Sequence, residues 1–64
     1  MLTKIQKIEV ITFMQGLCNE SHKKHNVYDI DPGTLASLAI MKFDYLNLSN
    51  GDYTKEVYEL ARYI

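Results

Sequence analysis

The most constraining feature of this sequence is a nearly uninterrupted apolar segment in its middle. Ten of the fourteen residues from 35 to 48 are apolar, within a chain of 64 residues. On a helix they would occupy almost the whole circumference and leave a narrow polar strip at Ser37, Asp44 and Asn47. A helix that is apolar on most sides is normally buried on most sides, and a chain this short has too few other elements to cover it. The segment therefore predicts a largely buried middle helix that is completed by dimerisation or by a partner.

The short length raises the question of what stabilises the fold. A domain of about 60 residues buries only roughly 60% of the surface that its unfolded chain exposes, so such chains commonly need a disulfide, a metal ion or a partner. The single cysteine, Cys18, excludes an intramolecular disulfide and points to a reducing compartment. Charged and amide residues interrupt the N-terminal stretch, which excludes a signal-peptide core and a membrane span there. We expect a cytoplasmic protein with a single domain over residues 1–64.

Two clusters of turn-forming residues divide the chain into three segments. Asp31 precedes Pro32, an arrangement typical of the cap and first residue of a helix. Asn50 and Gly51 readily adopt positive φ, and Asp52 can cap the helix that follows. We predict an all-α domain with helices over residues 3–25, 32–48 and 52–63.

The first segment carries apolar residues on two sides. Thr3 and Gln6 have the spacing of a capping box, which predicts a helix start. One side of that helix holds Leu2, Ile5 and Ile8, and the other holds Val10, Ile11, Phe13, Met14, Leu17 and Cys18. No single neighbour covers both sides. The β-branched run over residues 8–12 leaves a strand as the alternative, but the sequence has no second strand-like run to pair with it, so a helix is favoured.

Apolar side chains left over after one core is built are the candidates for binding a partner. In the middle helix, the arc suited to the internal core consists of Leu35, Leu38, Ala39, Phe43 and Leu46. Ile40, Met41 and Leu48 project away from that arc, and Tyr58 and Tyr63 fall outside the apolar stripe of the last helix. Tyr and Met are enriched at the centres of protein interfaces. These five are therefore the predicted partner-binding residues.

One group of residues suggests a metal site. Cys18, His22 and His25 follow the spacing C-x3-H-x2-H, with Asp29 or Asp31 as a fourth ligand for a structural zinc. Because Cys18 also belongs to the apolar set, a buried thiol next to a solvated helix end is the preferred interpretation. The sequence has no phosphate-binding glycine pattern and no pairing of nucleophile, base and orienting group. We predict no metal ion, no cofactor, no small-molecule substrate and no enzyme activity.

The function favoured by these patterns is a non-enzymatic protein–protein interaction domain. It would act as an adaptor, inhibitor or accessory regulator through an apolar helical surface, and would form a homodimer in isolation. The alternative is a small helix-turn-helix-like transcriptional regulator that presents Thr54, Lys55, Tyr58 and Arg62 to DNA. A net charge of −1 and the absence of any run of more than two basic residues disfavour the alternative.

Overall fold

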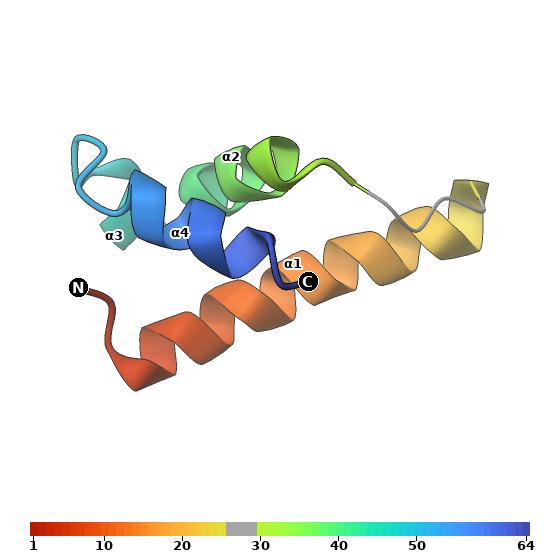
Figure 1. Ribbon diagram of the computed structural model, residues 1–64, viewed down its shortest axis with the longest axis horizontal. Coiled ribbons are helices and arrows are strands. Elements are labelled where there is room, and N and C mark those ends of the chain that lie inside the picture. Colours follow the sequence, from red (N-terminus) through yellow and green to blue (C-terminus); the bar gives the residue numbers. More distant parts are fainter. Residues whose placement is uncertain (26–29) are drawn as a thin grey trace.

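The chain folds into two layers of helices. The computed structural model describes residues 1–25 and 30–64, and over these ranges it has helices but no strand. The helices are α1 (Lys4–His25), α2 (Pro32–Lys42), α3 (Asp44–Asn47) and α4 (Thr54–Ala61). In Figure 1, α1 runs the length of the molecule, and α2, α3 and α4 form a second layer above it. The prediction of an all-α fold is confirmed for the described residues.

α1 begins at the predicted capping box. The backbone N–H of Thr3 donates to Oε1 of Gln6 at 2.9 Å, and the backbone N–H of Gln6 donates to Oγ1 of Thr3 at 3.1 Å. The helix continues through residues 8–12, so the strand alternative is wrong. Tertiary packing stabilises this β-branched stretch as a helix, because Val10 and Met14 are fully buried against the second layer.

The middle segment forms two helices, so the prediction of one helix over residues 32–48 is wrong. α2 ends at Lys42 because Phe43 has an extended backbone, with φ −106° and ψ 123°. This conformation directs the ring of Phe43 edge-on toward Phe13 of α1, with 5.8 Å between the ring centroids. The ring centroid of Tyr45, in α3, lies 5.5 Å from that of Phe43. Aromatic packing between the layers thus accompanies the break in the helix.

Within this chain α2 is buried along one stripe, and the covering of its other sides by a second chain stays a prediction. Leu35, Ala36 and Ala39 are buried, whereas Leu38, which we expected in the core, is 38% exposed. Ile40, which we expected to project away, packs against the core. The predicted arc assumed one helix through residue 48. Because the chain turns at Phe43, α2 instead presents the side of Ala36 and Ile40 to its neighbours.

α4 is shorter than the predicted helix over residues 52–63. Asn50 and Gly51 have φ of 55° and 85°, so the turn before α4 has the predicted positive φ values. Asp52 does not cap the helix, which is a further correction: Tyr53 occupies the cap position and makes no side-chain hydrogen bond there. The turn extends to residue 53, and α4 therefore starts only at Thr54.

The core lies between α1 and the layer above it. Its buried members are Leu2, Val10, Met14, Leu35, Ala36, Ala39, Leu46, Val57 and Ala61. α4 contributes its buried residues Val57 and Ala61 to this core. None of the helices in the described ranges is long and apolar enough to span a membrane.

Candidate protein interaction surfaces

The five predicted partner-binding residues differ in exposure and lie on different elements. Met41 on α2 is 70% exposed, Leu48 directly after α3 is 80% exposed, and Tyr63 after α4 is 87% exposed. Tyr58 on α4 is 42% exposed. Ile40 is half-buried against the core. The structure therefore places four of the five side chains at the surface, distributed from α2 to the end of α4.

α2 and α4 meet where Tyr58 borders the start of α2. A methyl group placed on Gly33 would lie 4.0 Å from Cε2 of Tyr58. Leu38 and Met41 lie one turn apart on the solvent side of α2. Leu38 is a surface residue that the sequence interpretation missed, because it had been assigned to the core arc.

Tyr63 lies in a groove between α4 and the N-terminal segment. The groove has a volume of about 500 Å³ and is lined by Met1, Lys7, Asp52, Lys55, Glu56, Glu59, Leu60 and Tyr63. Its lining combines apolar side chains with both basic and acidic groups, the two kinds of side chain that protein interfaces contain.

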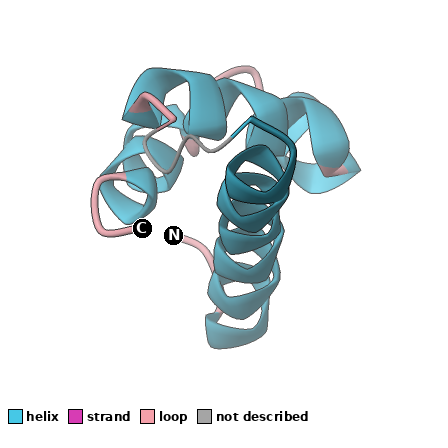
Figure 2. Cartoon of the chain, turned by 90° about the vertical axis from the view of Figure 1, so that its right-hand side faces the viewer, coloured by secondary structure: helices cyan, strands magenta, loops and turns pink. Residues whose placement is uncertain are grey.

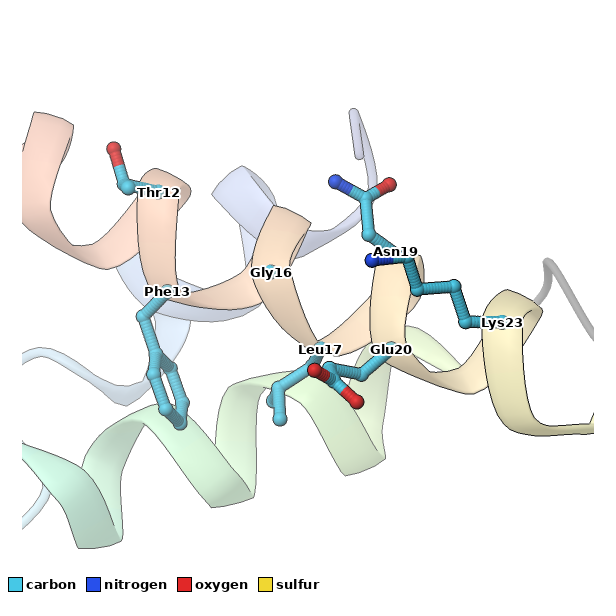
Figure 3. A pocket seen from close by; sticks show the side chains of 7 residues that line it. All are labelled: Thr12, Phe13, Gly16, Leu17, Asn19, Glu20 and Lys23. Carbon is cyan, nitrogen blue, oxygen red and sulfur yellow. The ribbon is translucent and has the colours of Figure 1, made fainter.

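A second hollow lies along α1. It has a volume of about 460 Å³ and is lined by Thr12, Phe13, Gly16, Leu17, Asn19, Glu20 and Lys23. Figure 3 shows Phe13 and Leu17 pointing toward α2, whereas Thr12 and Asn19 point to the other side of α1. Gly16 lies between these two groups, and a Cβ placed on it would meet no heavy atom within 4 Å. The missing side chain of Gly16 therefore opens this part of the α1 surface.

The outer face of α1 carries two more exposed hydrophobic residues. Ile5 is 72% exposed and Ile8 is 54% exposed. The five predicted partner-binding residues do not include them. The signal was nevertheless present in the sequence, because the apolar residues of the first segment fall on two sides of the helix and the core covers only one.

The residues considered for a metal site do not come together in the described part of the chain. Cys18 is a half-buried free cysteine packed against the core. Among the described residues, no group of three or more His, Cys, Asp or Glu side chains is placed to hold a metal ion. The side chain of His25 and the whole of Asp29 lie outside those residues.

The surroundings of Tyr45 alter its pKa. Its hydroxyl oxygen is buried and has no hydrogen-bond partner within the described ranges. Burial raises the pKa of Tyr45 above its ordinary value, and the negative charge of Glu9 raises the pKa further. Tyr45 thus senses the charge of Glu9 on α1, while its ring centroid lies 5.5 Å from that of Phe43.

The residues proposed for DNA contact are accessible but are interleaved with acidic ones. Thr54, Lys55 and Arg62 are exposed along α4 and at its C-terminal end. Nη1 of Arg62 lies 3.7 Å from Oε1 of Glu59, one turn before it. Part of the positive charge of this helix is therefore matched within the helix, which weakens its attraction for phosphates.

Comparison with known proteins gives no match to a family model, to a curated protein or to a solved structure. The fold and its surfaces thus define a class only: a small all-α protein whose helices leave several large apolar side chains exposed.

Proposed function

We propose that this chain is a non-enzymatic protein-binding module that acts as an adaptor, inhibitor or accessory regulator. It binds its partner through the exposed apolar side chains of α2, α4 and the turn between α3 and α4. Met41, Leu48, Tyr58 and Tyr63 are the contact residues. In the absence of a partner the chain associates with itself.

One observation carries this proposal: the helices build one core and leave a second set of large apolar side chains in solvent. The exposed set consists of Met1, Ile5, Ile8, Leu38, Met41, Leu48, Tyr58, Tyr63 and Ile64. Single exposed hydrophobic residues are ordinary on a protein surface, whereas neighbouring ones form a patch of the kind that marks an interaction site, as Leu38 and Met41 do one turn apart on α2.

The polar side chains of the groove beside Tyr63 support a binding role over a catalytic one. Glu56 accepts a hydrogen bond from the backbone N–H of Leu2, and Glu59 pairs with Arg62. These carboxylates therefore serve structural contacts within the domain. The apolar side chains of Met1, Leu60 and Tyr63 remain for contact with another protein.

The experiment is a comparative affinity capture from the source cells with three tagged chains. These are the unaltered chain, Met41→Asp and the control Asn50→Asp, which adds the same charge at an exposed turn position. We expect at least one protein to be captured by the unaltered chain and by Asn50→Asp in similar amounts. Met41→Asp should capture about tenfold less of it, because a charge buried in the interface opposes docking.

Equal retention of every captured protein by Met41→Asp and the unaltered chain would overturn the proposed contact surface. Circular dichroism of the three chains checks that all are folded. Met41 is exposed, so its replacement leaves the core intact.

A further inference from the structure

The outer face of α1 has the residue spacing of a two-stranded helical interface. Alternating steps of three and four residues connect five exposed positions, which we call the α1 seam: Ile5, Ile8, Thr12, Gln15 and Asn19. Steps of this kind keep side chains on one face of a helix and define the a and d positions of a coiled coil. None of the five carries a charge. An asparagine at an a position, as at Asn19, is a feature of two-stranded pairs.

The charges beside the seam are complementary between two copies of the same helix. Lys4 and Glu9 flank Ile5 and Ile8 on opposite sides, and both are exposed. In a parallel pair, a residue on one flank faces the residue five positions later on the other flank of the partner. Lys4 of each copy therefore faces Glu9 of the other, and the two-fold symmetry of a dimer makes this contact twice.

An antiparallel pair would lack this match. With full overlap of the two α1 helices, Ile5 and Ile8 would lie against the polar half of the other copy, between Ser21 and Lys24. Apolar side chains would then oppose charged and hydroxyl groups. The distribution of residues along the seam thus favours the parallel arrangement.

The fold leaves room for a second copy on this side. Val10 and Met14 face the core from the opposite side of α1 and are fully buried. Figure 1 shows the other helices above α1 and none below it, and Figure 2 shows the same one-sided arrangement nearly along the axis of α1. The remaining helices of two paired copies would therefore point away from each other.

The accessible surface of the chain is larger than its mass predicts. The accessible surface of 4693 Å² exceeds by roughly 500 Å² the value of about 4,200 Å² that is typical of a monomeric protein of this mass. A standard interface buries about 800 Å² from each partner. An excess smaller than this is the size expected of a weak or transient contact.

We propose that two copies of this chain pair in parallel along the α1 seam, with Ile5 and Ile8 in contact across the two-fold axis and Lys4 facing Glu9 of the other copy. This inference rests on the self-association included in the proposed function, and it names the face that carries it. The face is separate from the partner-binding residues on α2 and α4.

The test is sedimentation velocity at protein concentrations from about 5 to about 500 µM. We expect the unaltered chain to shift from monomer to dimer over this range. Ile8→Asp weakens the association at least about tenfold, because it places two negative charges in the seam. Asn50→Asp, which adds the same charge at an exposed turn position outside the seam, leaves the dimer unchanged.

Charge exchange tests the same pairing with little risk to the fold. Lys4→Glu places like charges opposite each other and weakens the dimer, while acidic residues in the first turn of a helix are themselves favourable. The double variant Lys4→Glu with Glu9→Lys restores the opposite charges and the association. The direction of pairing is tested with Thr12→Cys in a Cys18→Ser background, which forms an intermolecular disulfide only when the two residues 12 lie side by side.

A chain that remains monomeric over the whole range, or an Ile8→Asp variant that associates like the unaltered chain, would overturn the α1 seam. If Met41→Asp breaks the dimer and Ile8→Asp does not, the seam is wrong while the proposed apolar surface of α2 stands. Failure of the Thr12→Cys cross-link in a chain that dimerises would overturn the parallel arrangement.

Discussion

Glu56 of α4 anchors the N-terminal segment by accepting a hydrogen bond from the backbone of Leu2. The N–H of Leu2 is shared between both carboxylate oxygens, at 3.1 Å to Oε1 and 3.0 Å to Oε2. The side chain of Leu2 lies outside any helix but is 4% exposed and belongs to the core. A hydrogen bond to an ionised acceptor is stronger than one between neutral groups. One carboxylate thus attaches the segment before α1 to the last helix.

We expect Glu56→Ala to lower the free energy of unfolding by about 1–3 kcal/mol, because it removes a charge-assisted hydrogen bond and loosens a buried leucine. Urea denaturation followed by circular dichroism measures the change. Glu59→Ala is the matched control on the same helix: its carboxylate forms an exposed pair with Arg62, so its loss should cost about 0.5 kcal/mol or less. Equal stability of the two variants would show that Glu56 anchors nothing.

Gly16 and Gly51 should respond to alanine in opposite directions. Gly16 is exposed within α1, and a Cβ there meets no heavy atom within 4 Å, so Gly16→Ala should stabilise the protein by about 0.5–1 kcal/mol. Gly51 has φ of 85°, a conformation strained for other residues. Gly51→Ala should therefore destabilise the protein by about 1 kcal/mol or more. Thermal melting at low protein concentration compares both variants with the unaltered chain. A lower melting temperature for Gly16→Ala would contradict the finding that a side chain at residue 16 has free space around it.

Tyr45 should make the protein less stable at alkaline pH. Its pKa in the folded chain is raised from 10.0 by burial and by Glu9. The protonated hydroxyl therefore makes its full contribution to the stability of the fold below pH 10. This contribution is lost as the pH rises through the folded-state pKa of Tyr45. Tyr45→Phe should remove this loss and, since the hydroxyl has no partner within the described ranges, should leave stability at pH 7 equal or higher. Urea unfolding at neutral and alkaline pH tests both points. Tyr63→Phe, an exposed control, should behave as the unaltered chain does.

Asp31 and Asp52 should differ in their contribution to helix capping. Oδ2 of Asp31 accepts a hydrogen bond from the backbone N–H of Thr34 at 3.3 Å, so Asp31→Ala should cost about 0.5–2 kcal/mol. Asp52 lies one residue before the cap position of α4 and makes no capping bond there. Asp52→Ala should change stability by about 0.5 kcal/mol or less. Chemical denaturation of both variants measures the two losses of stability. A larger loss for Asp52→Ala than for Asp31→Ala would contradict the assignment of Asp31 as the helix cap.

The protein should show no salt-dependent binding to duplex DNA. Arg62 is paired with Glu59, and Glu56 also lies on α4, so the helix lacks the concentrated positive charge that neutralises phosphates. Fluorescence anisotropy with a mixed-sequence duplex at low salt measures this directly. Binding that weakens with salt and is lost in Lys55→Ala or Arg62→Ala would favour the regulator alternative over a protein-binding module.

Features that depend on neighbouring residues were predictable from the sequence. The capping box of Thr3 and Gln6, the Asp31 cap and the positive φ of Asn50 and Gly51 all form as the local chemistry predicts. Such features need only a few residues and the backbone between them. For the candidate surface, only exposure can be compared: four of the five residues are exposed, while Ile40 packs against the core, and their contact with a partner stays a prediction.

Features that depend on how the helices pack required the tertiary structure. Periodicity assigned Leu38 to the core and treated residues 32–48 as one helix, because a wheel drawn from sequence assumes that the helix continues and that a neighbour lies on its apolar side. The extended backbone at Phe43 broke that assumption by directing its ring toward Phe13.

The sequence by itself determined that the chain is helical, where two of its helices start and that it carries more apolar surface than one small core uses. Only the tertiary structure decided which surface remains outside. That choice depends on contacts between residues far apart in the chain, such as Glu56 with Leu2 and Phe13 with Phe43. These contacts fix the rotation of each helix, and the rotation leaves Ile5, Ile8 and Met41 in solvent.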